Sequence, residues 1–204
     1  MDLQNVINNL KARGFGVESF STGAEAADWL CQQLTDKTIG IGGSQSVQQL
    51  GLDARLAEKN TVYWHWLPEQ VQQYGDANAV RDLAAKAQVY LTSVNGLSAQ
   101  GQLISIDGAG NRIASMSYGH QEVYFLVGAN KIAENYDAAM ARARNVAAPL
   151  NARRLGRKTP CATGELKCHD CSSPERICNG FLTLERAMMG MKMTVLLVNE
   201  DLGA

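Results

Sequence analysis

Short apolar runs alternate with helix-forming segments through the first two thirds of the chain. The apolar runs at residues 38–41, 61–66, 88–93 and 123–127 are typical of buried strands, and the segments between them repeat apolar residues at helical spacing. Strands joined by helices form a parallel sheet, because each helix returns the chain to the edge where the next strand begins. The pattern therefore predicts an α/β fold with a largely parallel central sheet and helices on both faces.

Two later stretches are expected to add antiparallel hairpins to this sheet. Residues 103–118 contain an alternating apolar run followed by turn-forming residues at 107–111, which is typical of a hairpin. Residues 181–198 hold two apolar runs on either side of Gly190, and we interpret them as a terminal hairpin. Between these stretches, the apolar spacing over residues 132–146 predicts the most regular helix of the chain.

We expect a single α/β domain over residues 1–204. The sequence shows no internal repeat, low-complexity tract or long linker that would divide it. The late excursion at residues 159–180 contains two prolines, two glycines and few large apolar groups. Such a stretch cannot order itself by burying apolar surface. We therefore expect it to lie outside the sheet and to be ordered by its functional role.

Four of the five cysteines fall within this excursion, at a spacing of C-x6-C-x2-C-x6-C. Cys168 and Cys171 can turn toward one ion, and Cys161 and Cys178 can complete its coordination shell. Soft sulfur ligands hold both zinc and iron–sulfur clusters, so the spacing does not select the metal. We expect an iron–sulfur cluster, with zinc as the alternative. Disulfides, a redox-active pair and unligated thiols stay open.

Two residues near this pattern have a simpler interpretation. His169 lies between the central cysteines and could replace one of them as a ligand, but a histidine at such a position is more often a bystander. Cys31 sits in an apolar helical pattern and is expected to be a buried structural thiol.

Composition and charge exclude several classes of function. The formal net charge of −1 argues against general binding to nucleic acid or to membrane surfaces. No apolar run approaches the roughly 20 residues that span a bilayer, so we expect no membrane insertion. The first residues lack the basic and apolar segments of a signal peptide. We therefore expect a cytoplasmic protein, and a reducing cytosol favours metal or redox roles for clustered cysteines.

A candidate anion site follows the strand predicted at residues 38–41. The next helix is expected to begin at the capping pair Ser46 and Gln49. The residues between strand and helix are Gly42, Gly43 and Ser44. Glycines let the backbone approach an anion closely, and the N–H groups at a helix start favour negative charge. The segment lacks the G-x-G-x-x-G spacing and the P-loop lysine, so neither nucleotide motif applies. A tight turn without a ligand is the alternative.

Polar residues after other predicted strands complete this candidate site. Ser93 and Asn95 end the strand at residues 88–93 and can supply hydroxyl and amide contacts. The residues of the turn region that add an acid, an amide and a guanidinium are Asp107, Gly108, Asn111 and Arg112. Ligands of parallel α/β sheets bind outside the carboxyl ends of the strands, so we expect a small anionic metabolite here. A plain hairpin turn would also explain residues 107–111.

A basic stretch leads directly into Cys161. It consists of Arg153, Arg154, Arg157 and Lys158, with no acid among residues 151–158. Such a stretch is usually a solvated helical face. Guanidinium groups bind carboxylates and phosphates bidentately, so we expect one or two of these side chains to help bind an anion or an acidic partner near the cysteines.

Six segments of the chain resemble, in order, the lactate-utilisation (LUD) domain family, which includes LutC-like and YkgG-like proteins. They are Ile41-Gly-Gly-Ser44, Thr92-Ser-Val-Asn95, Asp107-Gly-Ala-Gly-Asn-Arg-Ile-Ala114, Val127-Gly-Ala-Asn-Lys-Ile132, Ala148-Pro-Leu-Asn-Ala-Arg-Arg-Leu-Gly156 and the cysteine segment 161–178. The resemblance covers nearly the whole chain. The four-cysteine segment is similar to that of a subset of the family.

The resemblance implies a fold of the NagB/RpiA/CoA transferase-like superfamily and a role in lactate utilisation beside iron–sulfur partner proteins. Isomerases of that superfamily carry an Asp-Gly-Ala-Asp segment. This chain has Asp107-Gly-Ala109 but Gly110 at the second acidic position. Proton transfer needs a positioned base, so sugar-phosphate isomerisation is not expected. The chain also has no clear counterpart of the CoA-transferase glutamate nucleophile.

Three functions stay open from the sequence. The first is a redox-accessory LUD protein in lactate or related organic-acid utilisation, with a cysteine-bound centre and an iron–sulfur or oxidoreductase partner protein. The second is an enzyme or sensor that binds a sugar phosphate, a CoA ester or a carboxylate at the 42–44 loop, with the cysteines as a structural zinc site. The third is an interaction module in which zinc only holds the late loop together.

Overall fold

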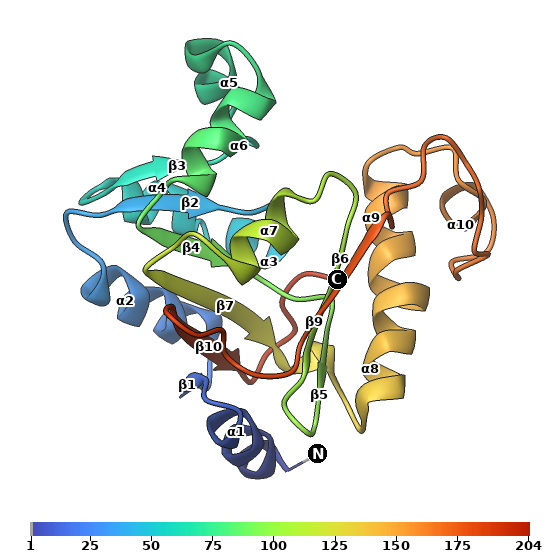
Figure 1. Cartoon of the computed structure of the whole chain (residues 1–204), viewed down its shortest axis with the longest axis horizontal. Coiled ribbons are helices and arrows are strands. Elements are labelled where there is room, and N and C mark those ends of the chain that lie inside the picture. The colour runs from blue at the N-terminus through green and yellow to red at the C-terminus, as the bar shows by residue number, and fades with distance from the viewer. Residues whose placement is uncertain (1) are drawn as a thin grey trace.

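Residues 2–204 are described by the structure, which is a computed structural model (Figure 1). Its largest element is a six-stranded parallel sheet in the order β1-β10-β7-β4-β2-β3. The strands are β1 (Gly16–Phe20), β2 (Thr38–Ile41), β3 (Thr61–Tyr63), β4 (Val89–Thr92), β7 (Glu122–Gly128) and β10 (Lys192–Val198). The predicted α/β fold with a largely parallel central sheet is confirmed.

Helices cover both faces of this sheet. On one face lie α2 (Gly23–Gln33), α3 (Gln45–Gln49) and α4 (Leu52–Ala57), and on the other lie α1 (Leu3–Ala12) and α7 (Asn111–Ser117). The side chains of β7 alternate between the two cores: Tyr124 and Leu126 pack on the first face, and Phe125 and Val127 on the second. A strand covered on both faces is apolar throughout, which explains why the sequence pattern located it.

A smaller mixed sheet packs against the second face, in the order β8-β5-β6-β9. Its strands are β5 (Gly96–Ser98), β6 (Leu103–Asp107), β8 (Ile132–Ala133) and β9 (Gly180–Leu184). β6 pairs antiparallel with both β5 and β9, and β5 pairs parallel with β8. The structure therefore has the antiparallel additions that the sequence predicted, but different strands form them.

Two helices lie at the β3 edge of the main sheet, namely α5 (Pro68–Tyr74) and α6 (Ala77–Ala85). The sequence pattern did not predict α5. α6 approaches β2 so closely that a Cβ atom on Gly40 would clash with the backbone carbonyl of Ala84. Only glycine allows this approach, so Gly40 sets how tightly the helix packs on the sheet.

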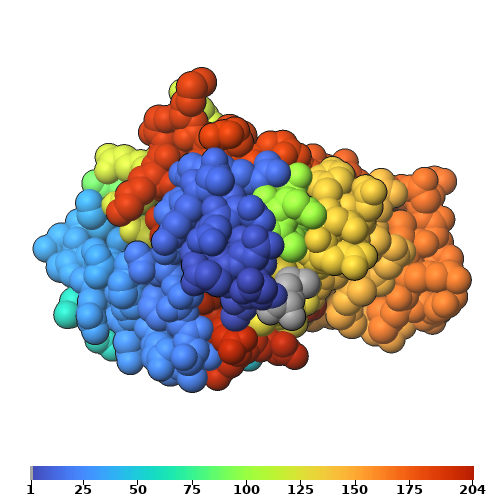
Figure 2. Space-filling view, turned by 90° about the horizontal axis from the view of Figure 1, so that it is seen from below, coloured from blue at the N-terminus to red at the C-terminus, as the bar shows by residue number. Residues whose placement is uncertain are grey.

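One long helix runs beside the smaller sheet (Figure 1). It is built from α8 (Tyr136–Arg142), a π-helical turn (Ala143–Ala147) and α9 (Ala148–Arg154). Pro149 has no backbone N–H to continue the i→i−4 pattern, and the wider turn stands just before it. The short helix α10 (Pro160–Thr163) and the cysteine segment follow. In Figure 2 the orange residues of this region form one end of the molecule, away from the dark-blue α1.

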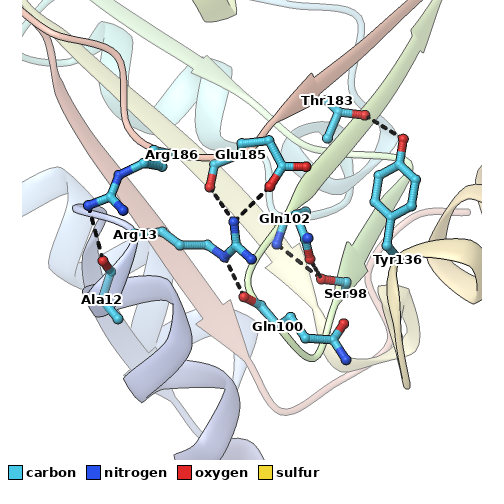
Figure 3. A network of polar contacts seen from close by, with 9 residues as sticks. All are labelled: Ala12, Arg13, Ser98, Gln100, Gln102, Tyr136, Thr183, Glu185 and Arg186. Carbon is cyan, nitrogen blue, oxygen red and sulfur yellow. Dashed lines mark hydrogen bonds and ion pairs between the residues drawn. The ribbon is translucent and has the colours of Figure 1, made fainter.

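Polar contacts fasten α1 and α8 to the smaller sheet (Figure 3). The guanidinium of Arg13, just after α1, donates to the carbonyl of Gln100 in the β5–β6 turn. It also donates to the carbonyl and the carboxylate of Glu185, after β9. The hydroxyls of Tyr136 and Thr183 lie 3.2 Å apart and join α8 to β9. These contacts hold the smaller sheet, and with it one side of the cavity described below, against the main sheet.

Neither predicted hairpin forms. After β6, residues 111–117 form the helix α7 instead of a returning strand, because Asp107 accepts the backbone N–H groups of Arg112 and Ile113 and so stabilises the helix start. β9 and β10 do not pair with each other. β9 joins the smaller sheet, whereas β10 inserts between β1 and β7.

Two local predictions also differ from the structure. The helix predicted over 132–146 begins only at Tyr136, because Ile132 and Ala133 pair with β5. The cap of α3 is Ser44 and not Ser46, whose hydroxyl instead donates to the carbonyl of Leu202. No helix among residues 2–204 has the length and apolar character to cross a membrane.

Candidate functional site

Three neighbouring parallel strands end at one edge of the main sheet and supply polar residues to a common cavity. The segment 42–44 follows β2, Ser93 and Asn95 follow β4, and Lys131 follows β7 after a 3-10 turn (Ala129–Lys131). The β6–α7 loop and the end of α9 form other walls. The cavity has a volume of about 450 Å³. This size and position are typical of small-molecule sites in open α/β sheets.

The structure places eight of the nine predicted ligand-binding residues along this cavity. They are Gly43, Ser44, Ser93, Asn95, Asp107, Gly108, Asn111 and Arg112. The ninth, Gly42, is not part of the lining: its N–H donates to the carbonyl of Leu91, and its carbonyl accepts from the indole of Trp64. A Cβ atom on Gly42 would lie 2.7 Å from the hydroxyl of Tyr90, so close packing accounts for this glycine.

The helix after the Gly-Gly-Ser segment is a weak source of positive potential. α3 has five residues, and its first turn is already capped: the hydroxyl of Ser44 accepts from the N–H of Val47 at 3.3 Å. A helix this short adds few aligned peptide dipoles, so charged side chains are the stronger source of positive potential around the predicted anion site.

Basic side chains outnumber acidic ones around the cavity. The basic residues are Arg81, Arg112, Lys131, Arg154, Arg157 and Arg176, and the acidic residues are Asp107 and Glu175. Both carboxylates are engaged by the backbone. Asp107 accepts the N–H groups of Gly108, Arg112 and Ile113, and Glu175 accepts that of Lys158. The cavity is therefore electropositive and favours an anionic ligand.

Arg112 connects three walls of the cavity. Its Nη2 donates to Asn95 Oδ1 at 3.1 Å and to the carbonyl of Ile106 at 2.7 Å. Its Nη1 lies 3.4 Å from the carbonyl of Gly43. The guanidinium is thereby held between the loops after β2, β4 and β6. A cation fixed in this way is pre-organised for a carboxylate or a phosphate.

Two buried nitrogens at the cavity have no protein partner within residues 2–204: His65 Nδ1 and Arg81 Nε. Burial, together with the charge of Arg81, lowers the pKa of His65 to about 4. His65 is therefore neutral at physiological pH. Buried polar atoms without partners are uncommon in proteins, and the two residues that carry them line this cavity.

Lys131 is the most deeply buried charged side chain of the lining, with 3% of its surface exposed. Its Nζ donates to the hydroxyls of Ser46 at 2.9 Å and Ser93 at 2.8 Å. Burial lowers the pKa of Lys131 to about 7, helped by the charges of Arg142 and Arg112. A large fraction of the amine is therefore neutral near pH 7.

Sequence reasoning missed Lys131, His65 and Arg81 as site residues. Lys131 lies in the turn that follows β7, and a lysine just beyond the carboxyl end of a central strand is the feature that could have found it. His65 and Arg81 belong to a loop and a helix face, and local sequence gives no indication that the fold brings them together.

The four basic residues of the stretch 153–158 do not all lie at the cavity. Arg154 and Arg157 line the cavity, and the guanidinium of Arg154 lies 4.6 Å from the ring centre of Trp66. Arg153 points elsewhere and donates to the carbonyls of Ala162 and Gly164, which fastens α10 to α9. Lys158 is exposed and is not part of the lining.

The four clustered cysteines line a second, much smaller cavity of about 20 Å³. All of them are half-buried free thiols, and Cys161 Sγ lies 3.2 Å from the hydroxyl of Thr159. Burial raises the pKa of Cys178, and neighbouring Cys168 and Cys171 add to this rise, whereas Arg176 opposes it. His169 also lines this cavity.

The thiols gather around one space but do not form a closed ligand set. Among residues 2–204, no three cysteine, histidine, aspartate or glutamate side chains stand in an arrangement that could hold a metal ion. The donor chemistry suits zinc or an iron–sulfur cluster. The side chains as they lie would have to close further around such a group.

The two cavities share part of their walls. Ala148, Arg176 and Ile177 line both. The guanidinium of Arg176 donates to the carbonyls of Cys171 and Cys178 and forms an ion pair with Asp170. The segment that carries the cysteines therefore also supplies a wall of the larger cavity.

The fifth cysteine is distant from this segment. Cys31 is half-buried on α2 and packs against the first core, and burial raises its pKa. A structural role for this thiol agrees with its position.

A comparison with models of protein families shows the family of the chain. The model of the LUD domain matches residues 3–198. The chain belongs to the LUD domain family. The family predicted from six sequence segments is thereby confirmed. Each of these six segments contributes at least one residue to the lining of the larger cavity of this LUD protein.

One solved structure supports the fold. The LUD protein is similar to a DUF162 family protein from Deinococcus radiodurans, with a TM-score of 0.53 and 12% identity over 96% of this chain and 94% of that chain. A likeness to eIF2B delta from Chaetomium thermophilum has a TM-score of 0.36 and 18% identity, and covers 54% of this chain and 48% of that chain. At these identities the first likeness shows the fold alone. No curated protein matches the sequence.

Proposed function

We propose that this LUD protein binds a small anionic metabolite, a carboxylate or a phosphorylated compound, in the cavity at the ends of β2, β4 and β7. The observation that carries the proposal is the charge of this cavity: six basic side chains surround it, and its two carboxylates are engaged by backbone N–H groups. Membership of the LUD family favours lactate or a related organic acid as the metabolic context.

The size of the cavity supports a ligand with more than one recognised group. A volume of about 450 Å³ exceeds what a three-carbon acid fills. Arg112 lies at the sheet end of the cavity, whereas Arg154 and Arg157 come from the end of α9. One ligand with two anionic groups, or with one anionic group and a polar extension, would match basic side chains on two walls of the cavity. A sugar phosphate or a CoA ester is the alternative ligand class.

We further propose that the four-cysteine segment holds a redox or metal centre beside this site. Cys161, Cys168, Cys171 and Cys178 are the residues that would hold it, and all four border one small cavity. An iron–sulfur cluster would supply one-electron transfer there, whereas zinc would only order the segment. The chain would then serve as a redox-accessory protein of organic-acid utilisation in the cytoplasm, with an iron–sulfur or oxidoreductase partner.

Isothermal titration calorimetry tests the anion site. The probes are L-lactate, pyruvate, inorganic phosphate, ribose 5-phosphate and acetyl-CoA, each at low and at high salt. We expect saturable heat from at least one of these compounds, with weaker affinity at high salt because charge dominates the recognition. Binding of the carboxylates alone, or of the phosphorylated compounds alone, identifies the class. The absence of saturable heat for every probe at about 1 mM would contradict the proposal.

Metal analysis tests the cysteine centre separately. The protein is purified without oxygen and measured for iron, sulfide and zinc, beside a variant with Cys168→Ser and Cys171→Ser. We expect iron and sulfide, or zinc, in the unchanged protein and a large loss in the variant, because thiolates are the soft ligands that both centres need. Equal metal content in the two proteins would exclude the cysteines as ligands.

A further inference from the structure

Lys131 differs in its surroundings from every other lysine of the described chain. The other lysines are exposed or half-exposed, namely Lys11, Lys37, Lys59, Lys86, Lys158, Lys167 and Lys192. Lys131 is almost fully buried, yet it borders the larger cavity. The turn after β7 places it between the loops that follow β2 and β4. Its amine is therefore reached only from the cavity side.

The partners of this amine do not stabilise a positive charge in the way a carboxylate would. Its Nζ donates to two hydroxyls, and none of the ion pairs within residues 2–204 includes it. The nearby charges that act on it come from Arg142 and Arg112, and both are positive. Arg142 is fixed by donating to the carbonyls of Asn130 and Asn95.

A buried amine without a counter-ion costs free energy in the folded protein. In a merely structural position, a leucine or methionine would fill the same space without this cost. The serine hydroxyls also have other partners, since Ser46 lies 3.3 Å from Ser93 and donates to Leu202. The amine is therefore better explained by chemistry at the cavity than by packing.

We propose that Lys131 forms an imine with the carbonyl carbon of a 2-oxo acid whose carboxylate is held by the arginines of the cavity. The inference deepens the proposed function, on which it rests, because it names the substrate class of that site. A 2-oxo acid is the oxidation product of a 2-hydroxy acid such as lactate. It combines the anionic group that the arginines recognise with an electrophile that a neutral amine attacks.

The step balances without any oxidant or reductant. The lone pair of Lys131 Nζ attacks the carbonyl carbon, a C–N bond forms, and the carbonyl oxygen takes up a proton. The nitrogen gives up both of its N–H protons in turn, the first to form the carbinolamine hydroxyl and the second so that this oxygen leaves as water, and a C=N bond remains. Ser46 and Ser93 hydrogen-bond to Nζ, so their hydroxyls can pass these protons between nitrogen and oxygen. Arg112 lines the same cavity and donates to Asn95, two residues beyond the Ser93 that holds Lys131, so it is placed to pair with the carboxylate.

Reductive trapping tests this chemistry directly. The full chain is incubated with pyruvate and cyanoborohydride, and the product is analysed by intact mass and peptide mapping. We expect one reduced adduct per chain, located at Lys131, and none with L-lactate, which has no carbonyl to attack. Trapping should increase from about pH 6 to about pH 8, because only the neutral amine reacts and the pKa of Lys131 is lowered to about 7.

Variants and a binding measurement separate the outcomes. Lys131→Met should abolish the adduct, and Lys158→Met, which removes an exposed lysine outside the lining, should retain it. Mapping on the unchanged chain keeps the test valid even if Lys131→Met folds poorly. Pyruvate that binds by calorimetry without an adduct, or with adducts spread over exposed lysines, would overturn the imine alone. Absence of binding by every probe would overturn the proposed function as well.

Discussion

Burial of the Lys131 amine affects the stability of the fold as well as its chemistry. The pKa of this group is about 7 in the folded protein, below the ordinary lysine value that it has when unfolded. Below pH 7 both states carry the proton, and the folded state bears the whole cost of the buried charge. The cost declines as the pH rises from about 7 and vanishes above about pH 10, where both states are neutral.

Lys131→Met should therefore stabilise the protein at neutral pH, by on the order of a few kcal/mol, as is common when a functional polar group is replaced in a buried position. The gain should shrink steadily between about pH 7 and about pH 10. Urea unfolding of both proteins across this range measures it. A gain that is independent of pH, or a loss of stability at pH 7, would show that the buried amine is a structural partner of Ser46 and Ser93.

At the residue level, the sequence pattern predicted those site residues that closely follow a buried strand. Ser93, Asn95 and the segment 42–44 were found because apolar runs mark where β2 and β4 end. Arg112 was predicted from the turn-forming residues 107–111, although in the structure these residues lead into the helix α7. His65 and Arg81 could not be found, because only the packing of α6 beside the β3 edge brings them to the cavity.

At the level of elements, the cysteine segment is held by few contacts of its own. Arg153 and Arg176 donate to its carbonyls, Asn145 Oδ1 accepts from the N–H of Cys168, and α10 is its only helix within the described residues. Many of these groups are exposed, where single hydrogen bonds add little stability. A bound centre would add the missing ordering free energy.

Cys168→Ser or Cys171→Ser should consequently increase hydrogen exchange across residues 159–180 and leave the sheet residues 38–128 protected. The sheet has its own apolar faces and does not depend on the segment. Cys31→Ser, on α2, is the control and should leave the segment unchanged. Unchanged protection across 159–180 in the two cysteine variants would mean that ordinary packing holds the segment and would argue against a centre.

The order of strands shows where local sequence stops being informative. The apolar run at residues 38–41 located β2 at its observed bounds, since a strand covered on both faces is apolar along most of its length. The partners of β9 and β10 were not predicted, because pairing with β6 or insertion between β1 and β7 depends on contacts far apart in the chain. Two strands that follow each other in the sequence often pair as a hairpin, but they need not.

On the scale of the whole molecule, the cysteine segment and the larger cavity form one neighbourhood. Residues 174–177 belong to the segment and line the cavity, and Arg176 borders both cavities. Disorder of the segment should therefore also weaken binding at the cavity. In the proposed function, a metabolite would lie on one side of Arg176 and a thiol-bound centre on the other.

The central claim is that the basic side chains of the larger cavity bind an anion, and one pair of matched variants tests it most directly. Arg154→Ala with Arg157→Ala removes two charges from the lining, whereas Lys11→Ala with Lys158→Ala removes two exposed charges outside it. Calorimetry with the probe that binds the unchanged protein compares them. We predict at least a roughly tenfold loss of affinity, about 1.4 kcal/mol, for the first pair and little change for the second. Equal losses in both variants, or none in the first, would contradict the account.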